Sequence, residues 1–278
     1  MKIKILILTL ITVIYTSVFV YKNVDMVIID NKEPVVNETS NIMIGDKKYN
    51  TLQEAIDHAK DNDTINIYQT INENINIKNL SITINGNNNK ILASTYIGEN
   101  NNVVKSVIEI ENSNVIINDL IIDGENGIDI NKPNIGIYVN NSTIELNNIS
   151  IININHKMDL LTHYPYGTCI YVVKSIDEDL LLKISGCSLT NFHQTGIYIN
   201  NHSEGDYDIQ IKDNLIRGIG RTLDVEQRGI VIYGNVSGEI TNNTLEDIYY
   251  LNSISNKNYI IISDMSSLLI VDGNKYNN

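Results

Sequence analysis

All three arginines of the chain lie within twelve residues of one another. They are Arg217, Arg221 and Arg228, in a sequence whose other basic side chains are lysines and histidines. A guanidinium group binds a carboxylate through two parallel hydrogen bonds, which lysine cannot do. The cluster could hold the carboxylates of an acidic sugar, or it could pair internally with Asp224 and Glu226 of the same segment. Both interpretations stay open.

Proton-transfer groups lie in the neighbouring variable segments. Imidazole and phenol groups can act as general acids or bases, although a histidine in a loop often serves only as a local hydrogen-bonding group. The candidates for catalysis are His193, Arg221, Arg228, His163 and Tyr166. The candidates for substrate binding in the same segments are Arg217, Gln194, Asp224 and Glu226. Since Asp224 and Glu226 are only two residues apart, they are poor candidates for carboxylates on opposite sides of a glycosidic bond.

Three tyrosines repeat at nearly regular intervals. Tyr138, Tyr171 and Tyr198 each follow an isoleucine in a short apolar run. If these runs are equivalent strands, the tyrosines point outward and stack in one column. Such a column could bind sugar rings, or it could be an aromatic ladder that only stabilises a sheet.

Few residues suggest a cofactor. Asp123, Glu125 and Asp129 could supply oxygen ligands to calcium, although acidic loops are usually only solvated. Cys169 and Cys187 have neither a metal-binding spacing nor enough partners for a disulfide framework. No phosphate-binding loop or dinucleotide fingerprint is present.

The charge argues against nucleic acid as a partner. The formal net charge is −13, whereas a general nucleic-acid binder needs a basic face that neutralises phosphates. A polysaccharide or cell-wall glycan fits the sequence better as a partner.

The N-terminus has the organisation of an export signal. Lys2 and Lys4 precede an uncharged, mostly apolar stretch at residues 5–21, and Lys22 follows it. We expect residues 1–22 to be a signal anchor or a cleaved signal peptide, and residues 23–44 a linker. Residues 45–278 would then lie outside the cytoplasm, anchored to the membrane through residues 5–21 or secreted.

One short helix is predicted at residues 51–60. Thr51 and Glu54 form a capping box, and Leu52, Ala55 and Ile56 follow with the spacing of one helical face. We expect this helix to cover the first turn of the structure that follows.

The remainder of the chain is a series of short strands that repeats about every thirty residues. One series reads Gly-Ile-Tyr or a variant of it, with central residues 138, 171, 198 and 231, and a second contains polar residues at 119, 148, 187, 214 and 243. Two series with one period predict a solenoid in which each turn buries its apolar face against the next. Ile137, Ile170, Ile197 and Ile230 should form one buried column.

The repeats vary in length between the polar residue of the second series and the next Gly-Ile-Tyr strand. The variable segments are 123–135, 153–168, 190–195, 217–228 and 246–259. All of them should emerge on the same side of the solenoid, with the short segment 190–195 as the floor of a groove. On this model Arg221 or Arg228 should lie within about 10 Å of His193, roughly two strand spacings.

The predicted helix resembles the short helix that opens many β-helices of the pectin-lyase-like superfamily, and residues 64–278 resemble that superfamily. That resemblance implies an all-β right-handed parallel β-helix with a short N-terminal capping helix. It says little about activity, because the superfamily includes lyases, hydrolases, epimerases, adhesins and fibres. The sequence lacks the NTD, DD, GHG and RIK segments of polygalacturonases and the DPHD segment of epimerases. We therefore expect a surface carbohydrate-binding protein, with a polysaccharide lyase, hydrolase or epimerase acting on uronic acids as the alternative.

Overall fold

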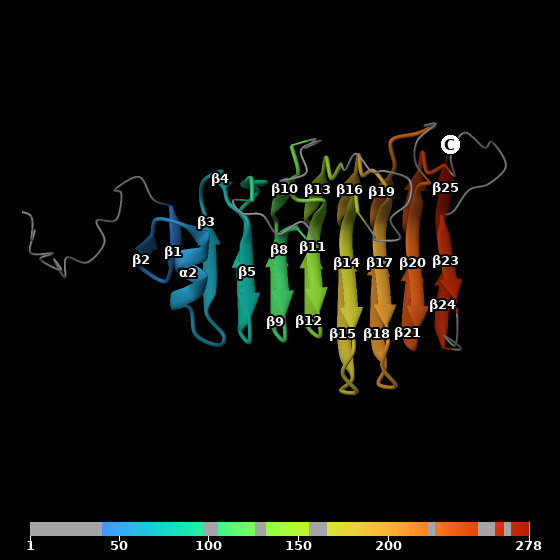
Figure 1. Cartoon of the computed structure of the whole chain (residues 1–278), viewed down its shortest axis with the longest axis horizontal. Helices are drawn as coiled ribbons and strands as arrows, with labels where there is room; N and C mark the ends of the chain where they lie inside the picture. The colour runs from blue at the N-terminus through green and yellow to red at the C-terminus, as the bar shows by residue number, and fades with distance from the viewer. Residues whose placement is uncertain are drawn as a thin grey trace, which may run out of the picture. The chain divides into compact units, whose positions relative to one another are not determined.

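The chain forms a parallel β-solenoid of about six turns, here called coils. The computed structural model describes residues 41–96, 105–125, 132–155, 166–221, 226–249, 259–263 and 268–277. Within them the described strands make three sheets that run the length of the solenoid, as Figure 1 shows. The predicted right-handed parallel β-helix is confirmed.

Each coil contributes one strand to each sheet. The ten-stranded sheet contains, in spatial order, β2 (Lys47–Tyr49), β1 (Ile42–Ile44), β3 (Thr64–Ile67), β6 (Ser81–Asn85), β9 (Asn114–Asn118), β12 (Thr143–Asn147), β15 (Leu180–Ser185), β18 (Tyr207–Lys212), β21 (Val236–Thr241) and β24 (Leu269–Asp272). The eight-stranded sheet contains β4 (Ile71–Asn72), β7 (Lys90–Leu92), β10 (Ile121–Asp123), β13 (Ser150–Ile152), β16 (Ser188–Thr190), β19 (Leu215–Arg217), β22 (Thr244–Glu246) and β25 (Lys275–Asn277). The seven-stranded sheet contains β5 (Ile75–Lys78), β8 (Ser106–Glu111), β11 (Ile135–Asn140), β14 (Thr168–Lys174), β17 (Thr195–Asn201), β20 (Arg228–Gly234) and β23 (Ile260–Ser263).

Columns of β-branched residues fill the core. Ile137, Ile170, Ile197 and Ile230 are paired in register from coil to coil and are completely buried. The predicted isoleucine column is therefore confirmed. Isoleucine suits these positions because its branched side chain packs well on a pleated sheet.

Asparagine and aspartate make the corners. Nearly all the non-glycine residues with positive φ are Asn or Asp, which tolerate the left-handed conformation better than other side chains. Asp119, Asn148 and Asn242 occupy such positions, and Gly186 takes the same place in its coil. The second repeat series found in the sequence therefore contained residues from two different structural columns. Positions 119 and 148 are left-handed corner residues, whereas 187, 214 and 243 each follow one.

The second of these columns is an internal amide ladder. Asn243 Oδ1 accepts hydrogen bonds from the backbone N–H of Asn214 (3.0 Å) and from its Nδ2 (2.8 Å). Asn274 accepts the equivalent pair of bonds from Asn243 at 2.9 Å each. Cys187 continues the column, since its backbone N–H donates to Asn214 Oδ1. Hydrogen bonds between asparagines of neighbouring coils thus occur inside the solenoid.

The glycine of the Gly-Ile-Tyr repeat has a steric explanation. A Cβ at Gly196 would lie 2.7 Å from the carbonyl oxygen of Gly229 and 2.6 Å from Ile216 Cγ2. At Gly136 a Cβ would lie 2.5 Å from the carbonyl oxygen of Cys169. The next coil leaves no room for a side chain at these positions.

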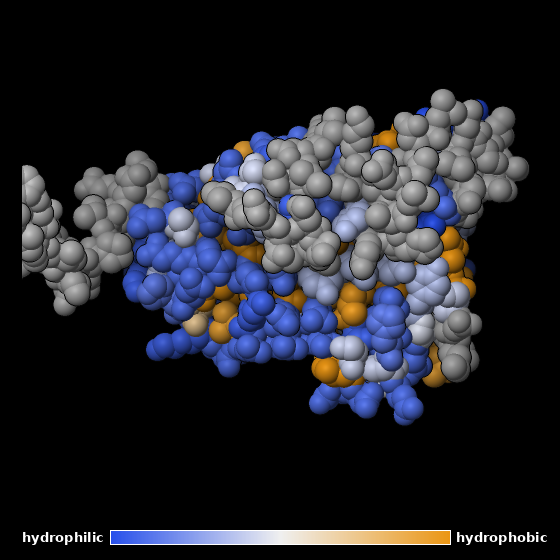
Figure 2. Space-filling view, in the orientation of Figure 1, coloured by the Kyte–Doolittle hydropathy of each residue, from blue (hydrophilic) through white to orange (hydrophobic). Residues whose placement is uncertain are grey.

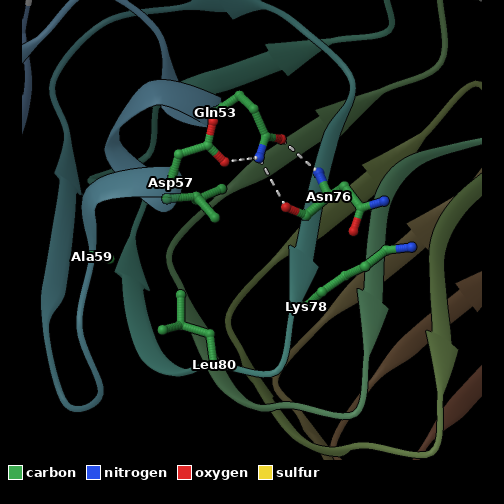
Figure 3. Close-up of a pocket in the computed structure, with 7 residues that line it drawn as sticks. Gln53, Asp57, Ala59, Asn76, Lys78 and Leu80 are labelled. Atoms are coloured by element: carbon green, nitrogen blue, oxygen red, sulfur yellow. Dashed lines mark hydrogen bonds between the residues drawn. The ribbon is translucent and has the colours of Figure 1, made fainter.

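The N-terminal end is covered by α2 (Leu52–His58) and by the antiparallel strands β1 and β2. Thr51 caps the helix as predicted, and Glu54 bonds the backbone N–H of Asn50. Figure 3 shows that the side-chain amide of Gln53 bonds both the N–H and the carbonyl oxygen of Asn76, on the outer edge of β5. Residues 42–44, which lie within the predicted linker, form β1 and pair with β3.

Candidate functional site

The described ends of the variable segments all lie at one corner of the solenoid. Each begins at the end of a strand of the eight-stranded sheet and leads into a strand of the seven-stranded sheet. Figure 1 shows β8, β11, β14, β17, β20 and β23 side by side, one to a coil, so these segments follow one another along the molecule. The predicted common side for the insertions therefore agrees with the topology. His163 and Asp224, together with Asp129, lie outside the described residues.

The short segment at residues 190–195 lies between the two segments that were expected to flank it. The backbone N–H of His193 donates to the carbonyl oxygen of Ile154, and that of Gln194 donates to Gly167. On the other side the Arg228 N–H donates to the carbonyl oxygen of Gln194. The described backbone thus places His193 and Gln194 between Ile154 and Gly167 on one side and Arg228 on the other. Tyr166, partly buried, lies next to Gly167 in sequence.

All three arginines are engaged within the chain. Arg217 donates to Glu246 Oε2 from Nε (2.8 Å) and Nη2 (2.7 Å). Arg228 pairs with Glu226 at 2.9 Å, and the guanidinium of Arg221 lies 5.3 Å from the ring centroid of Tyr249. Arg217 ends β19 and Arg228 begins β20, so only Arg221 lies in the connection itself. This pairing favours the internal interpretation of the arginine cluster.

Gln227 is a residue that the sequence analysis missed. Its buried side chain accepts from the N–H of Ile219 (2.8 Å) and donates to the carbonyl oxygen of Gly220 (2.6 Å). The connection between β19 and β20 is therefore held from inside by an amide as well as by its charged residues. A lone glutamine in a charged segment gives no sequence signal for this role.

The tyrosines form the predicted column on the outer face of the seven-stranded sheet. Tyr138 and Tyr171 are 5.4 Å apart between ring centroids, and Tyr171 and Tyr198 are 5.3 Å apart. Tyr233 extends the column, with its ring 5.7 Å from that of Tyr198. Tyr233 was missed because it stands two residues beyond Val231, which occupies the tyrosine position of that coil. We call these four residues the tyrosine column.

The rings of the tyrosine column pack against one another at an angle. Their planes are inclined by 47°, 80° and 42° along the column, and such tilted pairs add about 0.5–1.5 kcal/mol beyond area burial. The three inner rings are partly buried, and Tyr233 is exposed. The column stabilises the sheet and still leaves aromatic surface accessible.

A carboxylate lies at one end of the tyrosine column. Glu109 precedes Tyr138 in the same register row, and burial raises the pKa of both groups. Burial also raises the pKa of Tyr198, and the charge of Arg228 opposes that shift.

A row of buried polar side chains lies beside the tyrosine column. Ser106, Ile135, Thr168, Thr195 and Arg228 are paired in register across five coils. Ile135 is buried without belonging to the central core, which indicates that this row faces away from it. Among the described residues, the buried polar side-chain atoms without a partner include those of Ser106, Asn134, Thr168, Gln194 and Thr195. Buried polar groups are rarely left unpaired. The unpartnered hydroxyl groups of Ser106, Thr168 and Thr195 are therefore unusual for buried positions.

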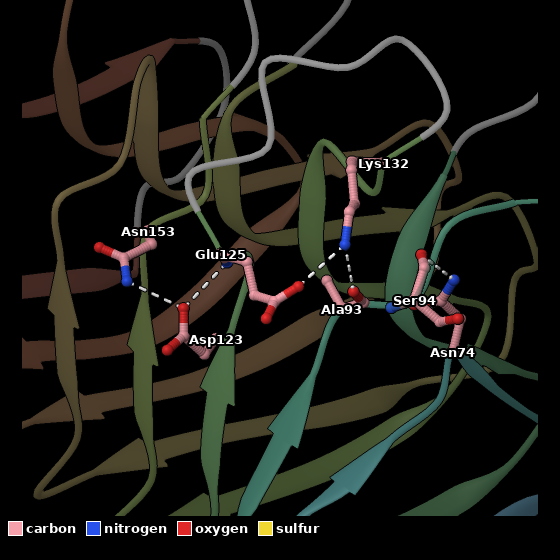
Figure 4. A network of polar contacts seen from close by, with 7 residues as sticks. All are labelled: Asn74, Ala93, Ser94, Asp123, Glu125, Lys132 and Asn153. Carbon is pink, nitrogen blue, oxygen red and sulfur yellow. Dashed lines mark hydrogen bonds and ion pairs between the residues drawn. The ribbon is translucent and has the colours of Figure 1, made fainter.

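Asp123 and Glu125, the two described carboxylates among those considered as calcium ligands, are bonded within the chain (Figure 4). Asp123 accepts from Lys90 (2.9 Å), from Asn153 Nδ2 (2.8 Å) and from the N–H of Glu125 (2.9 Å). Glu125 pairs with Lys132 at 2.8 Å. Among the described residues no group of three or more His, Cys, Asp or Glu side chains could hold a metal ion.

The hollows in the described surface lie elsewhere. One of about 390 Å³ separates α2 from β5 and is lined by Gln53, Asp57, Asn76 and Lys78, among others (Figure 3). A second, of about 450 Å³, follows the corner around Leu80, Asn112 and Asn141. Neither includes a residue of the tyrosine column, and both hollows are shaped by capping and corner residues.

Comparison with known proteins adds no assignment. No protein-family model matches the sequence, and neither curated proteins nor solved structures gave a match. In the part of the chain that the structure describes, no helix is both long and apolar enough to cross a bilayer. What can be stated of this chain is its architecture, a right-handed parallel β-helix.

Proposed function

We propose that this protein is an exported, surface-anchored β-helix that binds a neutral polysaccharide through the tyrosine column and catalyses no reaction there. The observation that carries the proposal is the column itself. Four aromatic rings follow one another at 5.3–5.7 Å, close to the spacing of the coils, about 4.8 Å. A linear glycan that lies along the solenoid axis would meet one ring for roughly each sugar.

The arginines favour a neutral glycan over one that contains uronic acids. Arg217 and Arg228 already pair with Glu246 and Glu226, so neither has an unshared charge to offer. Glu109 stands beside Tyr138 and would repel an acidic sugar. The net charge of −13 acts in the same direction.

The proposal also covers where the protein is located and which superfamily it belongs to. The apolar stretch at residues 5–21 between lysines supports export and a membrane anchor. The capping helix and the isoleucine columns support membership of the pectin-lyase-like superfamily, in which a binding role without catalysis would be one of several.

Glycan binding by the tyrosine variants tests the proposal. Calorimetric titration should detect binding of neutral oligosaccharides, such as those of cellulose, xylan or mannan. Tyr171→Ala and Tyr198→Ala should each weaken binding about tenfold, which corresponds to ~1.4 kcal/mol. Tyr171→Phe should retain most of the affinity because the ring remains. Tyr68→Ala is the matched control, since Tyr68 is exposed but lies outside the column.

A second experiment tests the alternative function, that of a polysaccharide-active enzyme. Polygalacturonate, alginate and glycosaminoglycans are incubated with the protein, with and without calcium, and absorbance of the unsaturated product is followed in the near ultraviolet. We expect no product. Arg217→Lys and Arg228→Lys should lower thermal stability and leave glycan affinity unchanged. Product formation, or loss of binding in the arginine variants alone, would overturn the proposal in favour of the enzyme.

A further inference from the structure

A second row of outward side chains runs along the tyrosine column. Because side chains alternate along a strand, the residue two positions after each tyrosine of β11, β14 and β17 points outward beside it. Paired in register from coil to coil, these residues are Asn140, Val173 and Asn200. All three are partly exposed, and we call them the amide row. Figure 2 shows side chains of intermediate hydropathy over β11, β14, β17 and β20, next to hydrophilic ones.

The two amides of this row are not used by the fold. Within the described part of the chain, the side-chain amides of Asn140 and Asn200 have no hydrogen-bond partner. Asparagines on the outer face of the ten-stranded sheet differ, since Asn147 donates to Asn118 and Asn118 to Asn85. An asparagine amide offers two donor hydrogens and an acceptor oxygen. Both amides of the row are therefore available to a ligand that carries hydroxyl groups.

Val173 explains why the two amides do not bond each other. It occupies the register position between Asn140 and Asn200, so these residues are two coils apart, about 10 Å at the usual strand spacing. The amides therefore recur at every second coil, whereas a tyrosine ring is present at every coil. Tyr138 and Tyr198 each have an amide beside them, and Tyr171 has an apolar side chain in the same position.

A β-1,4-linked glycan has the matching pattern. In an extended chain of this kind each sugar is turned over relative to its neighbours, so the hydroxyl groups of one edge recur at every second sugar. If each sugar lies on one tyrosine, the same edge faces the amide row at Tyr138 and Tyr198, and the opposite edge faces it at Tyr171. Chains with β-1,3 or α-1,4 linkages wind into helices and do not present their edges in this alternation.

We propose that Asn140 and Asn200 select a β-1,4-linked glycan by hydrogen bonding to the hydroxyl groups of every second sugar. The inference rests on the glycan-binding function proposed above and adds the linkage to it. An amide both donates and accepts, and it carries no charge, so it suits the hydroxyl groups of a neutral sugar. Val173 contacts the sugar between them, on the edge that needs no polar partner there.

Oligosaccharides that differ in linkage test the selection. The full chain in mild detergent is titrated calorimetrically with β-1,4-linked cellohexaose, xylohexaose and mannohexaose, and with β-1,3-linked laminarihexaose and α-1,4-linked maltohexaose. We expect at least one β-1,4-linked probe to bind about tenfold more tightly than both of the others, a difference of ~1.4 kcal/mol. Equal or tighter binding of laminarihexaose or maltohexaose would overturn the inference.

Variants of the amide row test the contacts. With the tightest β-1,4-linked probe, Asn140→Ala and Asn200→Ala should each weaken binding about fivefold, the usual effect of one lost hydrogen bond. The double variant should lose about 25-fold, because sites two coils apart without a shared partner act independently. Val173→Asn should not raise the affinity, since the sugar at that coil turns its other edge. Asn114→Ala, at an exposed asparagine of β9 on a different sheet, is the control and should bind like the native protein.

The outcomes separate this inference from the binding function. The thermal midpoint of both asparagine variants should stay unchanged, because neither amide has a partner in the described chain. Unchanged affinity in both variants, together with weaker binding in Tyr171→Ala, would overturn the role of the amides and leave the binding function standing. A gain of affinity in Val173→Asn would contradict the alternation. Absence of binding to every probe would overturn the binding function and this inference together.

Discussion

Asp123 illustrates how single carboxylates are used in this protein. Burial raises its pKa, but the hydrogen bonds from Asn153, Lys90 and the Glu125 N–H outweigh burial and lower the pKa overall. A carboxylate whose pKa is lowered on folding stabilises the native state above the unfolded pKa of about 3.9. That contribution is lost as the pH falls through the folded pKa.

Asp123→Asn should therefore destabilise the protein at neutral pH. We expect the free energy of unfolding to fall by about 1–3 kcal/mol at pH 7, because the charge-assisted bonds to Lys90 and Asn153 are lost. The difference from the native protein should shrink as the pH is lowered below about 4. Urea unfolding at a series of pH values measures both effects. Asp46→Asn, on the exposed turn between β1 and β2, is the control and should change little. Equal stability of Asp123→Asn and the native protein at pH 7 would show that the network contributes nothing.

The arginine cluster is a second example at the scale of single residues. The residue types alone could not decide its role. A guanidinium near two carboxylates suits a substrate site and an internal ion pair equally well. The structure shows internal pairs for Arg217 and Arg228, and the partner of Arg217 is Glu246, 29 residues away in the next coil. Only the stacking of coils brings these two side chains together.

At the scale of elements, the loss of a hydrogen-bond partner should cost more in the amide ladder inside the solenoid than in the ladder on its outer face. Asn243 bonds Asn214, Asn274 and the carbonyl oxygen of Ile211 in the interior. On the outer face of the ten-stranded sheet, Asn147 bonds Asn118 at 2.9 Å in a partly exposed ladder. Water can replace a lost partner outside but not inside.

Asn243→Leu should therefore cost far more than the same change at Asn147. Replacement of Asn243 leaves the N–H of Asn214 and the carbonyl oxygen of Ile211 buried without partners, and we expect a loss of roughly 3 kcal/mol. Asn147→Leu, the matched variant, should cost less than about 1 kcal/mol. Denaturant unfolding of the two variants provides the comparison. Losses of similar size would mean that the inner ladder is not the stabilising element.

The repeat elements were predictable because their signals are local and periodic. The isoleucines at 137, 170, 197 and 230 recur with the strand period and the coil period together. The polar positions of the second repeat series were assigned only in part. Asparagine serves both as a left-handed corner residue, as at Asn148, and as an inward ladder residue, as at Asn214. Composition cannot separate these roles; the position relative to the turn does.

At the scale of the whole molecule, the solenoid has a helix over its N-terminal end. The N-terminal coil is covered by α2, whose residues Leu52, Ala55 and Ile56 are buried against it. In a solenoid each coil contacts only its neighbours, so local damage at one end need not reach the other. Stability should therefore vary along the axis.

Ala55→Asp should unfold the first coils selectively. A carboxylate at this completely buried position forces α2 away from the end of the core. Hydrogen–deuterium exchange should show loss of amide protection in β3 and β6, with β17 and β20 still protected. Asp57→Asn, on the exposed side of the same helix, should leave the pattern unchanged. Uniform loss of protection in Ala55→Asp would show that the solenoid unfolds as one cooperative unit.

The sequence by itself determined the architecture of this protein: a capping helix, strands that repeat about every thirty residues, and variable segments at one corner. It could do so because burial in a solenoid is periodic, and a period is visible without any contact being known. Only the tertiary structure decided which side chains pair between coils. The partners of the arginines and the extension of the tyrosine column to Tyr233 both depend on which residues the stacking brings within a few ångströms. A pairing across about thirty residues leaves no local pattern in the chain, so no reading of the sequence alone could assign it.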